Sequence, residues 1–217
     1  MDFLHSILDF VLHIDQHLTQ IVSQYGTLTY LILFAIIFFE TGLVVTPFLP
    51  GDSMLFAAGA IAALDGSGLN VYLLVALLIV AAFTGNTVNY FIGRFIGPKV
   101  YEKNYKLIRR EYLDRTKKFF DQYGAMTIIY TRFAPILRTF APFIAGVGQM
   151  KVSKFLLFNF IGGFLWVISF TYAGFFFGNI PFVKRNFEFI VLGIILVSLV
   201  PAAYAFLKVK FGKKKAA

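Results

Sequence analysis

The sequence predicts an all-α polytopic membrane protein, and three observations support this fold class. The chain has 217 residues, of which 59% are hydrophobic and only 14% are charged, and its mean hydropathy is +0.76. A soluble domain of this size carries far more charge. Long apolar segments are separated by short turns, and every Lys and Arg lies at or after Arg94. Lipid is therefore the expected solvent for most of the chain.

Residues 1–25 are expected to form an amphipathic helix at the membrane interface. One face of this helix carries apolar side chains at helical spacing, and the opposite face carries histidine, aspartate and glutamine. His13 and His17 are one turn apart, but no third metal ligand is evident. We therefore expect an interfacial anchor and no metal site.

Residues 27–97 form the first half of the predicted membrane domain. A span over 27–45 is followed by a re-entrant hairpin near 44–64, because the apolar run from 54 to 64 is too short to cross a bilayer. A full span follows over 70–97. The residues predicted to form the hairpin turn are Pro47, Pro50 and Gly51.

The span over 70–97 carries a stripe of small and polar residues at every fourth position, which permits close helix packing in lipid. These are Gly85, Asn89, Gly93 and Gly97. The segment 98–123 that follows contains the densest group of basic residues. It is expected on the cytoplasmic side, together with the lysine-rich tail at 209–217.

Residues 124–208 form the predicted second half. Its first part, near 124–148, is apolar but contains two arginines, and Pro135 and Pro142 are expected to form a hairpin. If this part enters the membrane and returns, the later spans near 152–178 and 188–207 leave the tail on the same side as the basic segment. That arrangement satisfies the positive-inside rule.

Two hairpins that enter from opposite faces, one after a span and one before a span, suggest an inverted repeat. Proline-interrupted short segments at corresponding positions of two halves are typical of transporter sites. A four-helix or six-helix membrane protein without hairpins is the alternative.

Four charged residues lie within the apolar segments and are the candidate substrate-binding residues. Glu40 lies about a dozen residues into the first span, and Asp52 follows the first hairpin turn, where it could cap a helix. Both acids are candidates for proton coupling. Arg132 and Arg138 flank Pro135, so a bend there would let both guanidinium groups converge on one phosphate or carboxylate. The alternative is a structural role in which each arginine pairs separately with Glu40 or Asp52.

A secondary polar path runs along the span over 70–97 and comprises Asn86, Asn89, Tyr90 and Arg94. Hydrogen bonds between helices are the favoured interpretation, with Arg94 extending to the cytoplasmic surface. Asn159, Trp166 and Tyr172 are interpreted as packing residues.

Three ordered motifs resemble the bacterial DedA family. They are Phe-Glu-Thr-Gly followed by Pro-Phe-Leu-Pro-Gly-Asp-Ser, then Gly-Asn-Thr-Val-Asn-Tyr-Phe-Ile-Gly-Arg, then Arg-Phe-Ala-Pro-Ile-Leu-Arg-Thr-Phe-Ala-Pro. The resemblance covers most of residues 25 to 180. It implies a multi-pass inner-membrane protein with facing hairpins, related to lipid scramblases that carry the VTT domain. By motif position, Glu40 and Asp52 look like the family's essential acids, and the two arginines like its essential arginines. One departure is that the family's Gly-Asp-x-x-x-Tyr element reads Gly85-Asn86 here.

The resemblance implies translocation of a phosphate-bearing lipid, dependent on the proton motive force. The lipid would be undecaprenyl phosphate or a phospholipid such as phosphatidylethanolamine. A proton-coupled small-cation antiporter is the alternative, and a lipid phosphatase or a membrane scaffold is less favoured. No histidine follows His17 and no phosphatase element is evident, so we expect no catalytic residues. The expected partners are membrane lipids and protons, with no cofactor and no nucleic acid. The sequence leaves open whether the protein forms a homo-oligomer.

Overall fold

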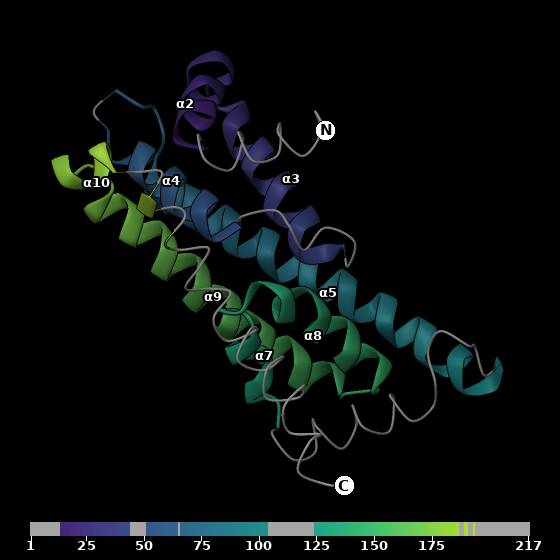
Figure 1. The fold of residues 1–217 in the computed structure, drawn as a ribbon. Coiled ribbons are helices and arrows are strands. Elements are labelled where there is room, and N and C mark those ends of the chain that lie inside the picture. The colour runs from purple at the N-terminus through teal and green to yellow at the C-terminus, as the bar shows by residue number, and fades with distance from the viewer. Residues whose placement is uncertain are drawn as a thin grey trace, which may run out of the picture.

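The computed structural model describes residues 14–43, 51–64, 66–103, 124–186, 189–190 and 193, and it is helical throughout these ranges apart from turns. The helices are α2 (Ile14–Tyr25), α3 (Leu28–Gly42), α4 (Gly51–Ala62), α5 (Val71–Lys103), α7 (Met126–Thr131), α8 (Pro135–Val147), α9 (Val152–Phe177) and α10 (Pro181–Arg185). Figure 1 shows α4 near one end of the long helices α5 and α9, and α7 with α8 near the other end.

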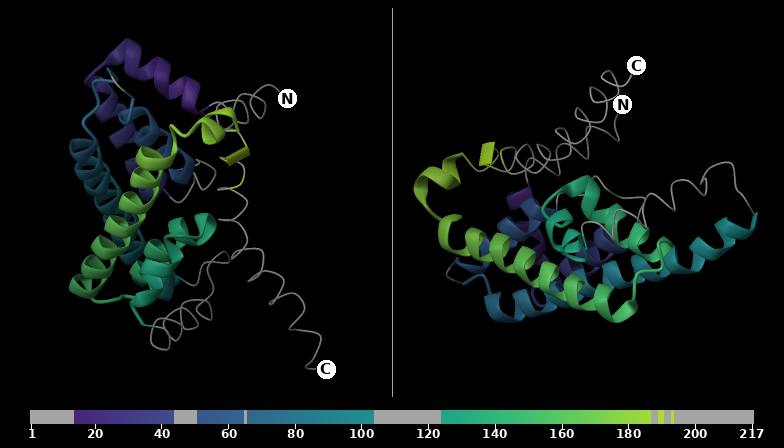
Figure 2. Two further views of the ribbon diagram at one scale, coloured as in Figure 1. Left: turned by 90° about the vertical axis from the view of Figure 1, so that its left-hand side faces the viewer. Right: turned by 90° about the horizontal axis from the view of Figure 1, so that it is seen from below.

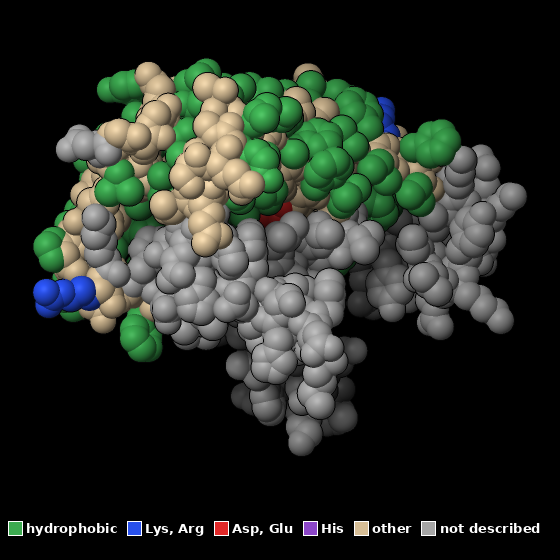
Figure 3. All heavy atoms as spheres, turned by 90° about the horizontal axis from the view of Figure 1, so that it is seen from above, with side chains coloured by type: hydrophobic (Ala, Val, Ile, Leu, Met, Phe, Trp, Pro, Cys, Tyr) green, Lys and Arg blue, Asp and Glu red, His purple; other side chains and the backbone are tan. Residues whose placement is uncertain are grey.

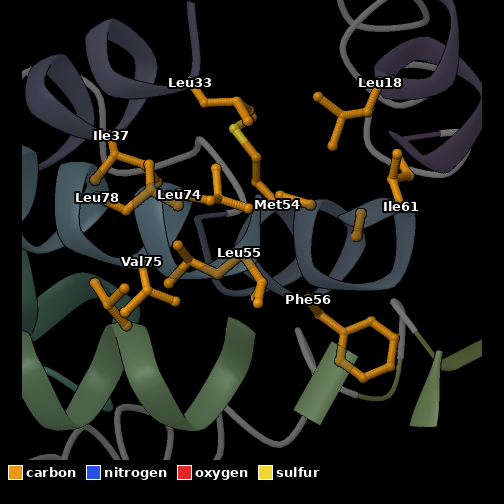
Figure 4. Close-up of a cluster of buried hydrophobic side chains, with 14 of the residues drawn as sticks. Leu18, Leu33, Ile37, Met54, Leu55, Phe56, Ile61, Leu74, Val75 and Leu78 are labelled. Atoms are coloured by element: carbon orange, nitrogen blue, oxygen red, sulfur yellow. The ribbon is translucent and has the colours of Figure 1, made fainter. Parts of the chain in front are cut away.

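Helix α2 agrees with the helical part of the prediction for residues 1–25 over Ile14–Tyr25, and residues 1–13 lie outside the described ranges. The helix ends at Gly26, whose φ of 52° suits a residue without a Cβ atom. Leu18 is fully buried and belongs to the same apolar cluster as Leu33, Met54 and Ile61 (Figure 4). The apolar side of α2 therefore packs, at least at Leu18, against the protein itself.

The first predicted span is shorter than expected. Helix α3 has 15 residues and ends at Gly42, because Leu43 is extended with φ −105° and ψ 123°. Such a helix is about 22 Å long, whereas the hydrocarbon core is about 30 Å thick. Helix α4 has 12 residues, as expected of a half-crossing segment. The turn before it, with Pro47 and Pro50, lies outside the described residues.

Two helices are long and apolar enough to cross a membrane, namely Val71–Gly97 within α5 and Val152–Phe177, which is α9. Both agree with predicted spans. Helix α5 continues to Lys103, so its last turns occupy the start of the segment that was predicted to be a basic loop. The fourth predicted span, near 188–207, lies almost wholly outside the described residues.

The second predicted hairpin region consists of α7 and α8, with the break at Arg132–Ala134. Pro135 does not form the bend but is the first residue of α8, where its fixed φ suits a helix start. Ala134 before it is extended, as residues before proline usually are. Pro142, also predicted to form the hairpin, lies inside α8, which continues past it to Val147, so the chain does not turn there.

The short helices α4 and α8 each cross a long helix at a pair of facing glycines. Gly59 and Gly174 bring α4 against α9, and Gly93 and Gly146 bring α5 against α8. A Cβ atom added to any of the four would lie between 1.8 and 2.1 Å from a backbone oxygen of the facing helix. The predicted small-residue stripe of α5 is thus confirmed as a packing surface. The α4–α9 crossing and the α5–α8 crossing lie toward opposite ends of the long helices (Figure 2).

The outer faces of the two long helices are strongly apolar. Among the exposed large side chains are Tyr72, Val88, Phe91, Phe95, Leu157, Phe160, Phe164 and Phe176. Figure 3 shows one face of the molecule on which hydrophobic side chains gather over much of the described surface. Exposed apolar surface of this extent indicates a lipid-facing protein.

Candidate functional site

Arg138 is held between two carboxylates in the interior of the protein. Its Nη2 lies 2.5 Å from Oε1 of Glu40, and its Nη1 lies 2.6 Å from Oδ1 of Asp52. Glu40 comes from the last turn of α3, Asp52 from the first turn of α4 and Arg138 from the first turn of α8. All three side chains are buried. These three residues form what we call the acid–arginine triad.

Glu40 lies directly against the start of α4. A Cβ atom on Gly51 would lie 2.1 Å from Oε2 of Glu40, so only glycine allows this approach. Oε2 has no hydrogen-bond partner among the described side chains. Asp52, predicted as a candidate helix cap, instead lies inside the first turn of α4. A carboxylate near a helix N-terminus is stabilised by the helix dipole.

Trp166 of α9 completes the surroundings of the triad. Its Nε1 donates to Oδ1 of Asp52 over 2.7 Å, the same oxygen that accepts from Arg138. Its ring centroid lies 4.8 Å from Cζ of Arg138 and 5.7 Å from Cζ of Arg132. One indole therefore contacts both arginines by cation–π interactions. Interpreting Trp166 as a packing residue missed this role.

Arg132 has a different environment and no described carboxylate within ion-pair distance. Its Nη2 donates to the carbonyl oxygen of Ala82 and to Oδ1 of Asn159, each over 3.0 Å. Its Nε and Nη1 have no partner among the described residues, although the side chain is only 1% exposed. Gly163 makes room for the flat guanidinium, since a Cβ atom there would lie 3.3 Å from Nη2.

The expectation that each arginine pairs with one acid is therefore wrong for Arg132. Both acids belong to Arg138 because α8 begins at Pro135 and places Arg138 in its first turn, beside α3 and α4. Arg132 lies in the break before α8 and extends across α9 and α5 instead. The two guanidinium groups still approach the same indole.

Two amides surround Arg132. Asn159 accepts from Arg132 and also receives a hydrogen bond from Asn86 over 3.2 Å. If the Asn86 amide is turned by 180°, this bond to Asn159 is replaced: the Asn86 oxygen then accepts from Nη2 of Arg132 over 3.0 Å and its nitrogen donates to the carbonyl oxygen of Thr41 over 3.1 Å. Asn86 was predicted as part of a polar path, whereas Asn159 was interpreted as packing. Both are fully buried, and both solvate a charge without neutralising it.

The remaining polar-path residues connect helices. Asn89 donates to the carbonyl oxygens of Thr41 and Thr139 over 3.3 and 2.8 Å. Tyr90 donates to the carbonyl oxygen of Met150, and Arg94 donates to that oxygen over 3.0 Å and to the Tyr90 hydroxyl over 2.8 Å. These bonds agree with the interhelical interpretation. Arg94 is half-buried and bound, so it does not simply extend to the surface.

The site thus contains two arginines and two acids, surrounded by buried neutral polar side chains such as Asn86, Asn89 and Asn159. Within the described residues, no group of three metal-ligating side chains is present. Nε and Nη1 of Arg132 are the buried guanidinium nitrogens left without a described partner, together with Nε of Arg138. The carboxylates come from α3 and α4, and the guanidinium groups come from α8 and from the break before it.

Comparison with known proteins identifies the family. Residues 49–176 match the VTT domain, and the chain is 51% identical to Protein DedA of Escherichia coli over the full length of both proteins. The chain belongs to the DedA family. Other DedA relatives are an uncharacterized membrane protein of Mycobacterium tuberculosis, 41% identical over 83% of this chain and 80% of its own, and Inner membrane protein YghB of Escherichia coli. The latter is 34% identical over 82% of this chain and 78% of its own. No solved structure matches the chain.

Proposed function

We propose that this DedA-family membrane protein translocates a phosphate-bearing lipid across the bacterial inner membrane. The substrate would be undecaprenyl phosphate or a phospholipid such as phosphatidylethanolamine. The observation that carries the proposal is Arg132, a buried guanidinium with no described carboxylate partner and with two unpartnered nitrogens. A guanidinium in a protein interior requires an anionic partner, and phosphate suits its geometry.

Charge balance gives the proposal its proton dependence. Two arginines and two ionised acids sum to zero, and an arriving phosphate anion would leave the buried cluster with excess negative charge. A net charge in lipid is costly, so anion entry favours uptake of one proton by Glu40 or Asp52. Loss of that proton on the other side would favour release of the lipid.

The proposed architecture is an inverted repeat with two re-entrant hairpins, the first near 44–64 and the second near 124–148. The reciprocal crossings support it, because α4 packs on α9 of the opposite half and α8 packs on α5. The short lengths of α3, α4, α7 and α8 support it as well. We place the basic segment 98–123 and the tail 209–217 in the cytoplasm, on the positive-inside rule.

Transport of a small cation is less compatible with this geometry. Glu40 and Asp52 would have to release Arg138 before they could bind a metal cation or sodium. Arg132 and Arg138 would then repel the arriving cation. The proposal contains no covalent step, so the lipid would cross unchanged.

Reconstituted vesicles test the proposal. The parent protein, Arg132→Gln and Arg185→Gln would each be given a labelled polyprenyl phosphate, with and without an imposed pH gradient. Arg185 is an exposed arginine of α10 and serves as the matched control. We expect movement of the lipid by the parent and the control, faster with the gradient, and at least a tenfold loss in Arg132→Gln. Sodium-driven proton movement without lipid movement would instead support the antiporter.

A further inference from the structure

We propose that Arg94, Lys151 and Lys154 form a further anion-binding site, which takes the phosphate group of an anionic lipid at the headgroup level of the bilayer. The site lies at one end of α5 and α9 and shares no residue with the acid–arginine triad. It does not depend on the proposed transport function, because it rests on different contacts.

Two contacts place Arg94 and Lys151 at the same end of the molecule. The ring of Tyr90 on α5 stacks on that of Phe155 on α9, with the centroids 4.1 Å apart. Arg94 lies about one turn after Tyr90, and Lys151 lies about one turn before Phe155. Nη1 of Arg94 donates to the carbonyl oxygen of Met150 over 3.0 Å, so the two helices run in opposite directions here. Arg94 therefore faces the start of α9, next to Lys151.

Arg94 is held in place but is not neutralised. Its Nη1 also donates to the Tyr90 hydroxyl over 2.8 Å, and its own carbonyl oxygen accepts from the Gln149 side chain over 3.1 Å. All of these partners are neutral, and the guanidinium is half-buried. Neutral acceptors satisfy the N–H groups of a guanidinium but leave its charge in place.

Like charges gather around this guanidinium. Lys151 directly precedes α9, Lys154 lies in its first turn, and that turn contains no acidic residue. Both lysines are exposed. Among the described residues, neither the lysines nor Arg94 have a carboxylate within ion-pair distance. The three cations repel one another, and an anion bound among them would relieve that repulsion.

The position of the cluster along the two spans identifies the anion as part of a lipid. The apolar span within α5 ends at Gly97, and that of α9 begins at Val152. The cations therefore lie where the hydrocarbon core gives way to headgroups, and basic residues at that level attract anionic lipid. Exposed apolar side chains of the same two helices offer surface to the acyl chains, namely Phe91, Phe95 and Leu157. A free phosphate ion would gain nothing from them.

The experiment measures how anionic lipid protects Lys151 from an amine-reactive reagent. The full-length protein is placed in nanodiscs of phosphatidylcholine with increasing fractions of phosphatidylglycerol, and labelling is read by mass spectrometry of the peptides. We expect protection of Lys151 to increase with the phosphatidylglycerol fraction. In Arg94→Gln and in Lys154→Gln, the fraction needed for half-protection should rise about fivefold, which is the contribution of one basic residue to anionic lipid binding.

Two features of the design separate a lost charge from a damaged fold. Lys154 is exposed, so Lys154→Gln tests the site even if Arg94→Gln disturbs the turn at Met150. Arg185→Gln is the matched control, because Arg185 is an exposed arginine of α10, which follows the opposite end of α9. This control should give the half-protection fraction of the parent.

Three results would overturn the inference. Lys151 could stay unprotected in the parent, or it could be protected equally in the parent, Arg94→Gln and Lys154→Gln, which would be the general effect of a negatively charged surface. Inorganic phosphate could protect Lys151 in pure phosphatidylcholine as well as phosphatidylglycerol does, and the ligand would then be a free anion. None of these results bears on Arg132, so the proposed transport function is tested separately.

Discussion

Replacing each arginine by glutamine separates the roles of Arg138 and Arg132. Arg138→Gln leaves two buried carboxylates without their cation, and removing one partner of a buried ion pair costs about 3 to 5 kcal/mol. Arg132→Gln removes hydrogen bonds to neutral oxygens only and also removes a buried charge, so we expect a loss of about 1 to 2 kcal/mol. For a chain of this length each kcal/mol lowers the Tm by roughly 2 to 4 °C. Arg138→Gln should therefore melt about 5 to 10 °C below Arg132→Gln.

The chain provides its own probe for this measurement, because Trp166 is its one tryptophan and lies against both arginines. Thermal unfolding in detergent would be followed by tryptophan fluorescence and by the helical circular dichroism signal. Arg185→Gln is the control and should melt like the parent. If Arg132→Gln melts as low as Arg138→Gln, then Arg132 has a carboxylate partner and the asymmetry between the arginines is wrong.

Three further predictions follow from the same contacts. Arg132→Lys should keep the charge but lose the planar fork, so lipid phosphate binding by native mass spectrometry should fall about tenfold; equal binding would remove the argument from guanidinium geometry. Gly174→Ala places a Cβ atom 1.8 Å from the Phe56 carbonyl oxygen, so thermal unfolding should show a loss of about 1 to 3 kcal/mol, and no loss would mean that α4 and α9 separate easily. Glu40→Gln should bind lipid phosphate at least as well as the parent but transport it without pH dependence in vesicles. If transport by Glu40→Gln kept the pH dependence of the parent, Asp52 would become the candidate proton carrier.

Much of the fold follows from local patterns in the sequence. The spans over 70–97 and 152–178 are long, apolar and uninterrupted, and helices α5 and α9 confirm them. The spacing of small residues on α5 likewise indicated where another helix would approach. Proline was a weaker guide: Pro135 begins a helix and Pro142 lies within one, because the first position of a helix tolerates proline and a buried helix can continue past a lost hydrogen bond.

The site was harder to predict because it depends on which residues meet across helices. The buried charges were identifiable from their cost in lipid, and the structure brings Glu40, Asp52 and Arg138 into contact. Their pairing was not identifiable, since it depends on the helix register that places Arg138 beside both acids. Asn159 and Trp166 are seven residues apart on α9, two helical turns on one face, and that spacing of polar groups in an apolar span was the signal available.

The hydrogen bonds of the two acids differ, and under the proposed function this difference bears on which acid would take up the proton. Oδ1 of Asp52 accepts from both Arg138 and Trp166. Oε2 of Glu40 has no partner among the described side chains, so a proton can bind there while Oε1 keeps its contact with Arg138. Protonation of Glu40 would weaken the attraction on Arg138 without dismantling the triad, and Arg138 could then contribute to phosphate binding beside Arg132. Because both guanidinium groups contact the indole of Trp166, a shift of Arg138 toward the lipid would also change the surroundings of that ring. Tryptophan fluorescence should therefore respond to lipid phosphate in the parent, and the same response should persist at high pH only in Glu40→Gln, where the acid is permanently uncharged.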